Sequence, residues 1–306
     1  MRYLKSSGFF SLFYIFLFMC LSIGASIFFS NTQVVTIIVY LGILIYSIGY
    51  ILLFKLDLKK TLRLHSLQIG SVFLLILLAL TIRPAAGFIS QIGSLFFQDL
   101  TSSSIIQESV QNVALAILTT GIMPGIVEEV VFRGIVYSGM RKARPVKGIL
   151  LSALFFGLAH MNFQQFCYAF FIGIIFGLVV EATDSIFSSM IMHAVFNTTS
   201  IVLSHFLYSS ETLSKTLTAS ATQTFQQKLF ALASSFPLAV VSFGVSLLIF
   251  IWIAHLNGRL GYLKSWFHKD IRTALPKERA TSISYFAALA ICFLYAVLTE
   301  FVSHLT

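Results

Sequence analysis

The sequence predicts an all-α fold, a polytopic transmembrane helical bundle of about eight to nine helices. Hydrophobic residues make up 58% of the 306 residues and charged residues only 10%. A soluble domain carries about 25% charged residues, and a soluble protein of this size cannot shield so much apolar surface from water. Proline occurs only 5 times, which suits long helices. These observations exclude a soluble enzyme, a disordered chain and a disulfide-linked scaffold.

Apolar runs that are long enough to cross a bilayer follow one another along the chain. A spanning helix needs about 20 mostly apolar residues. The first run follows two basic residues, as in a signal peptide, but no small-x-small cleavage site comes after it, so we interpret it as a retained helix. The two runs within 146–182 are short, and we expect one of them to be broken or re-entrant. The predicted spans lie at roughly 8–29, 33–54, 67–89, 108–132, 146–163, 165–182, 185–207, 229–255 and 282–303.

The segments between the spans are too short to form a soluble domain. Residues 90–107 contain a polar run and are expected to lie along the membrane interface. Residues 208–227 are rich in Ser and Thr and predict a solvated loop, whereas residues 256–280 predict an interfacial amphipathic helix. We therefore interpret residues 1–306 as a single integral membrane domain. Any active site must then lie in an intramembrane cavity that the helices enclose.

The basic residues predict the orientation of the chain. Lys and Arg total 20, Asp and Glu total 11, and the net charge is +9. If the N-terminus is cytoplasmic and the spans alternate, 17 of the 20 basic residues face the cytoplasm, and only Arg83, Lys215 and Lys228 do not. Cytoplasmic loops are rich in Lys and Arg, so the excess indicates membrane topology rather than nucleic-acid binding. We expect an integral protein of the bacterial plasma membrane with a cytoplasmic N-terminus.

Two adjacent carboxylates, Glu128 and Glu129, lie inside an apolar run. Charges inside spanning helices are costly and often mark functional sites. Adjacent helical residues point about 100° apart, so the two carboxylates face different neighbours. Glu129 and Arg133 are spaced i, i+4 and are expected to pair, which leaves Glu128 available as a general base. The alternative is that the ion pair only holds helices together. Pro124 and Gly125 are expected to loosen this helix and to free backbone carbonyls beside the site.

Two histidines lie in the apolar segments that follow. His160 ends the sequence Phe156-Gly-Leu-Ala-His, and His193 begins the sequence His-Ala-Val-Phe-Asn197. His193 and Asn197 are spaced i, i+4 and share one helical face, so both can donate hydrogen bonds to one point. Such an arrangement suits a developing oxyanion in a site that excludes water. A single His in a helix is usually only a packed polar residue, so this interpretation depends on the wider pattern.

The wider pattern is Glu-Glu-x-x-x-Arg, then Phe-x-x-x-His, then His-x-x-x-Asn, on three successive apolar segments. It resembles the CAAX protease and bacteriocin-processing (CPBP) family of intramembrane endopeptidases, which includes the type II CAAX prenyl endopeptidases. The resemblance covers a motif core at about 108–207, a third of the chain. The matching residues are Glu128, Glu129, Arg133, Phe156, His160, His193 and Asn197.

The resemblance implies roles for these residues. Glu128 would be the base that activates a water molecule, and His160 would orient or share that water. His193 and Asn197 would form the oxyanion hole. Glu129, Arg133 and Phe156 would be supporting residues.

The resemblance also implies a substrate and a direction of access. The substrate would be a membrane-bound protein or peptide, or a prenylated one that is cut after the modified Cys. The cavity would be conical and would open toward the cytosol. The predicted orientation agrees with this, because it places Glu128 near the cytoplasmic end of its helix, with Arg133 at the start of a basic loop at 133–147.

No cofactor is expected, although zinc is an alternative. Glu128, Glu129, His160 and His193 are residue types that bind zinc. However, the chain has no His-Glu-x-x-His segment, which would place two His ligands on one helical turn. The two glutamates also point in different directions. We therefore favour a metal-independent mechanism. The expected partners are membrane lipids and the substrate, and the sequence leaves the oligomeric state open.

Two other classes of function compete with a protease. The first is a non-catalytic membrane protein of the same fold, such as a bacteriocin-immunity or scaffolding protein, which need not keep all of the motif residues. The second is a transporter, because buried acids and histidines also form proton relays. A transporter predicts an inverted repeat, and the C-terminal half contains no second Glu-Glu segment.

Overall fold

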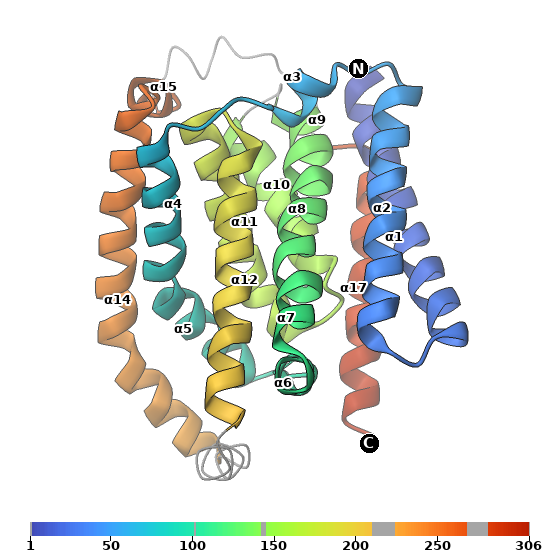
Figure 1. Cartoon of the computed structure of the whole chain (residues 1–306), viewed down its shortest axis with the longest axis vertical. Coiled ribbons are helices and arrows are strands. Elements are labelled where there is room, and N and C mark those ends of the chain that lie inside the picture. Colours follow the sequence, from blue (N-terminus) through green and yellow to red (C-terminus); the bar gives the residue numbers. More distant parts are fainter. Residues whose placement is uncertain (1, 101, 142–144, 210–223, 268–280, 306) are drawn as a thin grey trace.

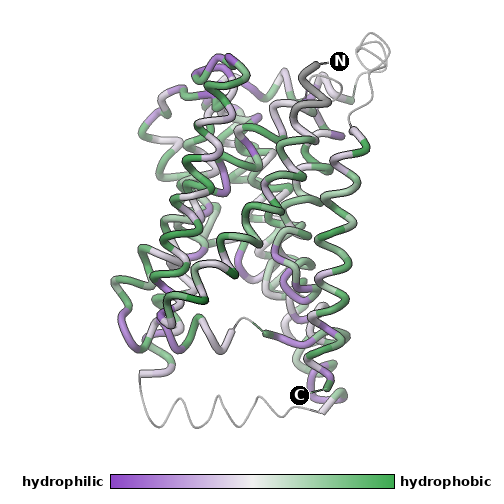
Figure 2. Tube along the Cα trace, turned by 90° about the vertical axis from the view of Figure 1, so that its right-hand side faces the viewer, coloured by the Kyte–Doolittle hydropathy of each residue, from purple (hydrophilic) through white to green (hydrophobic). Residues whose placement is uncertain are grey.

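A computed structural model describes the chain at residues 2–100, 102–141, 145–209, 224–267 and 281–305. Within these ranges the chain forms helices and no strand, which confirms the predicted all-α fold. The helices run side by side as an elongated bundle (Figure 1). Hydrophobic residues line the middle of the helices, and hydrophilic residues gather mainly toward the two ends (Figure 2). This distribution suits a bundle whose middle faces lipid.

Eight helical stretches of the described chain are long and apolar enough to cross a membrane. Two of them are interrupted: α4 (Ile69–Thr81) continues into α5 (Arg83–Ser94), and a run of short elements fills Val113–Arg141. The other six are α1 (Arg2–Phe28), α2 (Thr32–Leu53), α11 (Phe163–Thr183), α12 (Ile186–Ser209), α14 (Phe225–Leu256) and α17 (Ile283–Ser303).

The fifth predicted span, at 146–163, is a shorter helix and is the one that does not appear among these eight. It is α10 (Pro145–Leu158), with 14 residues, or about 21 Å at 1.5 Å per residue. A bilayer core is about 30 Å thick, so α10 alone does not cross it. The chain leaves the helix after Leu158 because Met161 adopts a left-handed conformation with φ 53°. The predicted interruption within 146–182 therefore lies between α10 and α11.

The two ends of the bundle carry different elements. The N-terminus lies at one end together with α3 (Leu58–Leu62), α9 (Tyr137–Arg141) and α15 (Leu260–Ser265), and the C-terminus lies at the other end with α6 (Ser102–Gln111) (Figure 1). Most of the predicted loop at 208–227 and of the predicted helix at 256–280 falls outside the described residues. Successive predicted spans alternate in direction, as the prediction that the basic loops lie at one end requires.

The N-terminal end carries a cluster of charges around a buried carboxylate. Glu181 of α11 is fully buried. Its Oε1 forms ion pairs with Arg63 Nη2 at 2.6 Å and with Arg141 Nε at 2.7 Å. Arg259 Nη2 lies 3.6 Å from the other carboxylate oxygen. One carboxylate thus joins α9, α11 and the residues that flank α3 and α15. A buried ion pair is costly to break because the remaining charge loses its partner.

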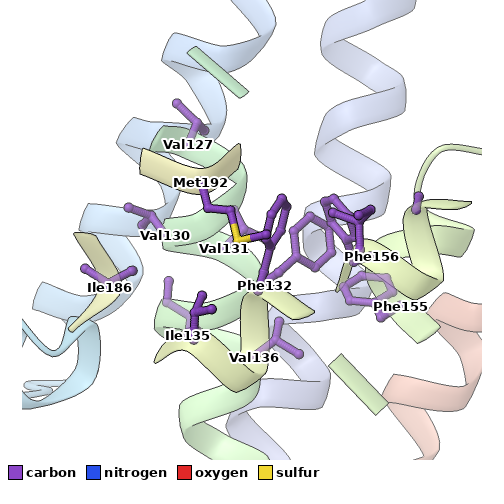
Figure 3. Close-up of a cluster of buried hydrophobic side chains, with 14 of the residues drawn as sticks. Val127, Val130, Val131, Phe132, Ile135, Val136, Phe155, Phe156, Ile186 and Met192 are labelled. Atoms are coloured by element: carbon purple, nitrogen blue, oxygen red, sulfur yellow. The ribbon is translucent and has the colours of Figure 1, made fainter. Parts of the chain in front are cut away.

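The centre of the bundle is α8 (Met123–Glu129), between two π-helical turns, η1 (Ile117–Ile122) and η2 (Val130–Val136). Side chains of η2 pack on α10, where the ring of Phe132 lies edge-on to those of Phe155 and Phe156 at centroid distances of 5.3 and 5.1 Å (Figure 3). This apolar cluster holds α8 in place beside α12.

Candidate active site

Glu129, Arg133 and His193 form a buried polar group on α8, η2 and α12. Arg133 Nη1 donates to Glu129 Oε1 at 2.9 Å, so the predicted i, i+4 pair is present. His193 Nδ1 lies 2.9 Å from the same oxygen. The Arg133 guanidinium lies 4.4 Å from the ring centroid of Phe156 and 5.2 Å from that of Phe176. Two aromatic faces and one carboxylate therefore compensate a cation in the interior.

The burial of Arg133 contradicts one prediction from the sequence. Arg133 is 2% exposed and lies inside η2, and the helical run continues to Arg141. It therefore does not begin a basic loop at 133–147, and Glu128 is not near the end of its helix. The prediction was wrong because a basic residue after an apolar run also fits a buried ion pair. Glu128 lies near the middle of the run Val113–Arg141.

Glu128 points to different partners, as the 100° offset predicts. Tyr40 of α2 donates its hydroxyl hydrogen to Glu128 Oε1 at 2.7 Å. The second oxygen, Oε2, lies 3.9 Å from His193 Nε2. The Glu128 side chain retains 15% of its exposure, whereas that of Glu129 is fully buried. Glu128 is therefore the carboxylate of the pair that a water molecule can reach.

His160 lies in the non-helical turn between α10 and α11. Its Nδ1 lies 2.8 Å from the carbonyl oxygen of Phe156. A carbonyl oxygen only accepts hydrogen bonds, so Nδ1 carries the hydrogen and Nε2 of the neutral ring carries the lone pair. The next residue, Met161, has φ 53°, a conformation that a non-glycine residue adopts only when its surroundings enforce it. The turn thus holds His160 in one orientation.

The same reasoning assigns the hydrogens of His193. The carboxylate of Glu129 accepts hydrogen bonds and does not donate them when it is ionised. Nδ1 of His193 must therefore donate, and its Nε2 has a lone pair in the neutral ring and a hydrogen in the imidazolium. The sequence-based expectation that His193 donates into the site holds only for the imidazolium.

Asn197 is positioned by a proline on the neighbouring helix. Pro124 has no N–H to donate to the carbonyl of Thr120, four residues earlier. Asn197 Nδ2 donates to that carbonyl at 3.2 Å. A side-chain amide has two hydrogens, which leaves one for a ligand. The expectation that Pro124 frees a carbonyl beside the site is thus met at Thr120.

A glycine permits the close approach of α8 and α12. A Cβ atom at Gly125 would lie 2.9 Å from the backbone nitrogen of Ala194 and 3.0 Å from its Cα. Real Cβ atoms do not approach backbone atoms so closely, so a side chain here would push the two helices apart. His193 and Glu129 would then separate as well, because His193 is next to Ala194 on α12 and Glu129 lies one helical turn after Gly125 on α8.

The four predicted catalytic residues line one cavity of about 150 Å³. Phe156 and Phe176 form part of its apolar wall, and Glu129 and Arg133 lie behind it. The polar residues of the lining are Tyr40, Thr120, Glu128, His160, Gln165, Tyr168, His193 and Asn197. A carboxylate, two imidazoles and an amide thus face one space inside the bundle.

Two further cavities share walls with this one. A cavity of about 270 Å³ shares Tyr40, Thr120 and Pro124 with it and extends between α1 and α2. A larger cavity of about 400 Å³ shares five residues with it: Thr120, Gln165, Tyr168, Phe196 and Asn197. The larger cavity reaches Asp99, Ser102 and Tyr208, at the end of the bundle opposite the N-terminus.

This direction separates two predictions that looked compatible. The basic residues predict that the N-terminal end faces the cytoplasm, and the resemblance implies that the cavity opens toward the cytosol. The adjoining larger cavity reaches the other end, and the Glu181 ion pairs lie at the N-terminal end. In this structure the two predictions therefore point to opposite ends of the bundle.

The alternative zinc ligands do not form a metal site as they stand. Over the described ranges, no group of three or more His, Cys, Asp or Glu side chains lies close enough together to hold a metal ion. Glu129 Oε1 and His193 Nδ1 are engaged with each other and with Arg133. Only Glu128 Oε2 and His193 Nε2 face one another, and a catalytic zinc needs three protein ligands.

Sequence reasoning missed four polar residues of this cavity, Tyr40, Thr120, Gln165 and Tyr168. The first two contact predicted site residues. Tyr40 carried a weak signal, a hydroxyl group in the middle of an apolar run. Thr120 carried a better one, because it stands four residues before a proline inside a predicted helix.

A comparison with known families gives a match over the part of the chain that contains the motifs. Residues 110–199 match the family model described as type II CAAX prenyl endopeptidase Rce1-like. The match covers all seven motif residues and lies within the predicted core at 108–207, so the predicted resemblance is confirmed at the level of the family. No curated protein and no solved structure matches the chain.

Proposed function

We propose that this protein is an intramembrane endopeptidase. It hydrolyses a peptide bond in a membrane-associated or lipidated, CAAX-like protein or peptide, with water activated by Glu128 and His160. The observation that supports this proposal is the single cavity of about 150 Å³ lined by Glu128, His160, His193 and Asn197. The matching family model over residues 110–199 supports a protease of this class.

The reaction begins with a water molecule between Glu128 and the scissile carbonyl. Tyr40 fixes one carboxylate oxygen of Glu128, and the other accepts a proton from the water. The lone pair on His160 Nε2 accepts the second hydrogen bond of that water and orients it. The water oxygen then bonds to the carbonyl carbon, and the negative charge moves to the carbonyl oxygen.

His193 and Asn197 stabilise that oxyanion. The imidazolium form of His193 donates through Nε2, and it is balanced by Glu129 on its other side. The second amide hydrogen of Asn197 donates to the same oxygen. Preorganised donors of this kind commonly contribute more to catalysis than any other single effect.

Glu128 completes the reaction as a general acid. It transfers the proton taken from water to the amide nitrogen, and the C–N bond breaks to give a carboxylic acid and an amine. The acid then passes its proton to the amine, and a carboxylate and an ammonium ion leave. The base is then ready for the next water molecule. Glu129 and Arg133 touch no reacting atom in this scheme, and they hold His193 in place.

The mechanism uses no metal. The expected result is that EDTA does not change turnover and that the purified, active protein contains less than stoichiometric zinc by elemental analysis. Loss of activity on chelation and its recovery with zinc would contradict this.

We propose that the N-terminus is cytoplasmic, in a bacterial plasma membrane, because the basic loops gather at the N-terminal end. The cavity then widens toward the extracytoplasmic side. Substrates reach it from that side, or laterally from the bilayer past α1 and α2, where the cavity of about 270 Å³ lies.

The test compares membrane-derived peptides from cells that express the wild type and Glu128→Gln at matched abundance. Glu300→Gln, which changes a carboxylate that does not line the cavity and accepts a hydrogen bond from the backbone of Gln98, is the matched control. The expected result is a set of fragments that the wild type and the control share and that Glu128→Gln lacks. Identical peptide profiles in all three strains would contradict the protease proposal and favour an immunity or scaffolding protein.

A further inference from the structure

Arg83 is a cation at membrane depth that the proposed mechanism does not use. It begins α5, after the interruption at Ile82 between α4 and α5, near the middle of the span Ile69–Ser94. Charged residues at such positions are costly and face the interior or a water-filled cavity. Arg83 follows this rule, because it lines the cavity of about 400 Å³ beside the catalytic one.

The partners of Arg83 are electrically neutral. Its Nη1 donates to the carbonyl oxygen of Phe196 at 2.6 Å, and its Nη2 donates to Ser200 Oγ at 3.1 Å. The guanidinium also lies 4.9 Å from the ring centroid of Phe196. These contacts orient the side chain, but they supply no negative charge.

The other arginines with contacts in the bundle are all paired with a carboxylate. Arg63, Arg141 and Arg259 pair with Glu181, and Arg133 pairs with Glu129. Within the described part of the chain, Arg83 has no carboxylate within 4.0 Å. An interior charge without a counter-charge is unfavourable, and a ligand that brings the counter-charge removes this cost.

The cavity around Arg83 is polar and adjoins the reacting groups. Arg83 contacts the carbonyl of Phe196, the residue directly before Asn197 on α12. The shared wall of the two cavities includes both Phe196 and Asn197. A group bound at Arg83 therefore occupies the cavity next to the one in which Glu128 would attack the peptide bond. Other polar residues of this cavity include Ser90, Gln164, Gln165, Tyr168 and Ser204, together with Asp99, whose carboxylate lies more than 4.0 Å from Arg83.

We propose that Arg83 binds a carboxylate of the substrate and so selects which peptide bond reaches Glu128. This proposal rests on the proposed protease function. A guanidinium has five N–H donors in a planar fork, and two contacts leave hydrogens for a ligand. The fork matches a carboxylate geometrically. The carboxylate is either the C-terminus of the peptide or an acidic side chain close to the scissile bond.

The test measures binding and needs no cleavage. The protein is purified with Glu128→Gln, which blocks the proposed hydrolysis, and placed in detergent with three acetylated tetrapeptides. The first is Ala-Val-Ile-Ala with a free carboxylate, and the second is its C-terminal amide. The third is Ala-Asp-Ile-Ala amide, which has a carboxylate only in a side chain. Dissociation constants are compared between the protein that retains Arg83 and the same protein with Arg83→Gln or Arg83→Lys.

With Arg83 present, at least one carboxylate peptide should bind about tenfold or more tightly than the neutral amide, as expected for a charge-assisted hydrogen bond. Arg83→Gln should abolish that preference, and Arg83→Lys should retain part of it. A preference for the free acid identifies the C-terminus, and a preference for the Asp peptide identifies a side chain. Lys228→Gln, which removes a positive charge outside the cavity, should preserve the preference.

The proposal is overturned if the protein with Arg83 shows no preference, or if Arg83→Gln keeps it. Thermal unfolding of each variant shows whether it is folded, and Arg83→Lys provides the second variant if Arg83→Gln unfolds. The fragment comparison with Glu128→Gln tests hydrolysis separately. Failure of carboxylate binding is therefore distinguishable from failure of the protease function.

Discussion

At the scale of single residues, two neighbouring carboxylates are separated by their partners. Glu129 is neutralised by Arg133 and His193 and is fully buried. Glu128 accepts a hydrogen bond from the neutral hydroxyl of Tyr40, and its side chain stays partly exposed in the cavity. The same chemical group thus has two different environments at adjacent positions. Substitutions at these residues should separate structural from catalytic effects.

Removal of the Tyr40 hydroxyl should slow the reaction without unfolding the protein. Tyr40→Phe deletes a hydrogen bond to a charged group, which is worth about 1.5–3 kcal/mol, so kcat should fall about tenfold to hundredfold. The measurement is single-substrate kinetics on a peptide found in the fragment comparison. Tyr46→Phe, whose hydroxyl bonds the backbone of α1, is the control. Unchanged kcat in Tyr40→Phe would remove Tyr40 from the site.

Substitutions in the buried ion pair should differ in their effect on abundance. Glu129→Gln leaves Arg133 without a counter-charge in the interior, which costs about 3–5 kcal/mol, whereas Arg133→Lys keeps the positive charge beside Glu129. Membrane abundance and thermal stability should therefore fall further in Glu129→Gln than in Arg133→Lys. Equal, wild-type abundance of both variants would show that the pair does not hold the fold.

At the scale of secondary structure, the helix that carries the carboxylates is irregular on both sides. Turns of π-helix precede and follow α8, and such turns frequently occur at functional sites. Pro124, the second residue of the regular part, cannot donate to the carbonyl that holds Asn197. The irregularity thus positions a residue on a different helix.

Restoring the missing backbone donor should impair catalysis while preserving stability. Pro124→Ala supplies an N–H that competes for the carbonyl of Thr120, so Asn197 loses its anchor. The melting temperature should stay the same or rise, and kcat should fall, though less than in Asn197→Ala. Loss of one oxyanion donor costs about 10²–10³ in kcat. Full turnover in Pro124→Ala would show that Asn197 does not depend on this carbonyl.

At the scale of the whole molecule, the direction of the cavity and the distribution of charge can be tested together. Single cysteines are introduced as Ser102→Cys and Lys60→Cys after Cys20, Cys167 and Cys292 are replaced by Ser. A membrane-impermeant maleimide should label the first in intact cells. It should label the second only after permeabilisation, because Lys60 lies at the N-terminal end. The reverse pattern would place the cavity mouth in the cytoplasm and would show that the basic residues mislead here.

Local patterns predicted much of this molecule. Composition and run length predicted the fold, and i, i+4 spacing predicted the Glu129–Arg133 pair, because both depend on neighbours in the chain. Tyr40 could not be predicted in the same way, since it meets Glu128 across 88 positions. The depth of Glu128 was mispredicted because a basic residue after an apolar run either begins a loop or pairs with a buried carboxylate inside the helix. Only the packed structure distinguishes them.

The short length of α10 has a consequence for the surrounding lipid. The helix covers about 21 Å of a hydrocarbon layer that is about 30 Å thick, and the chain then continues as the non-helical turn that holds His160. Non-helical backbone at this depth requires hydrogen-bonding partners that lipid tails do not provide. Here the protein provides them: the N–H groups of Ala159, His160 and Met161 donate to the carbonyls of Phe155, Gly157 and Leu158, and the turn lines the cavity through His160. The helix is still about 9 Å shorter than the hydrocarbon layer, and the bilayer adjusts to such a mismatch at a cost, so turnover should depend on the acyl-chain length of the host membrane.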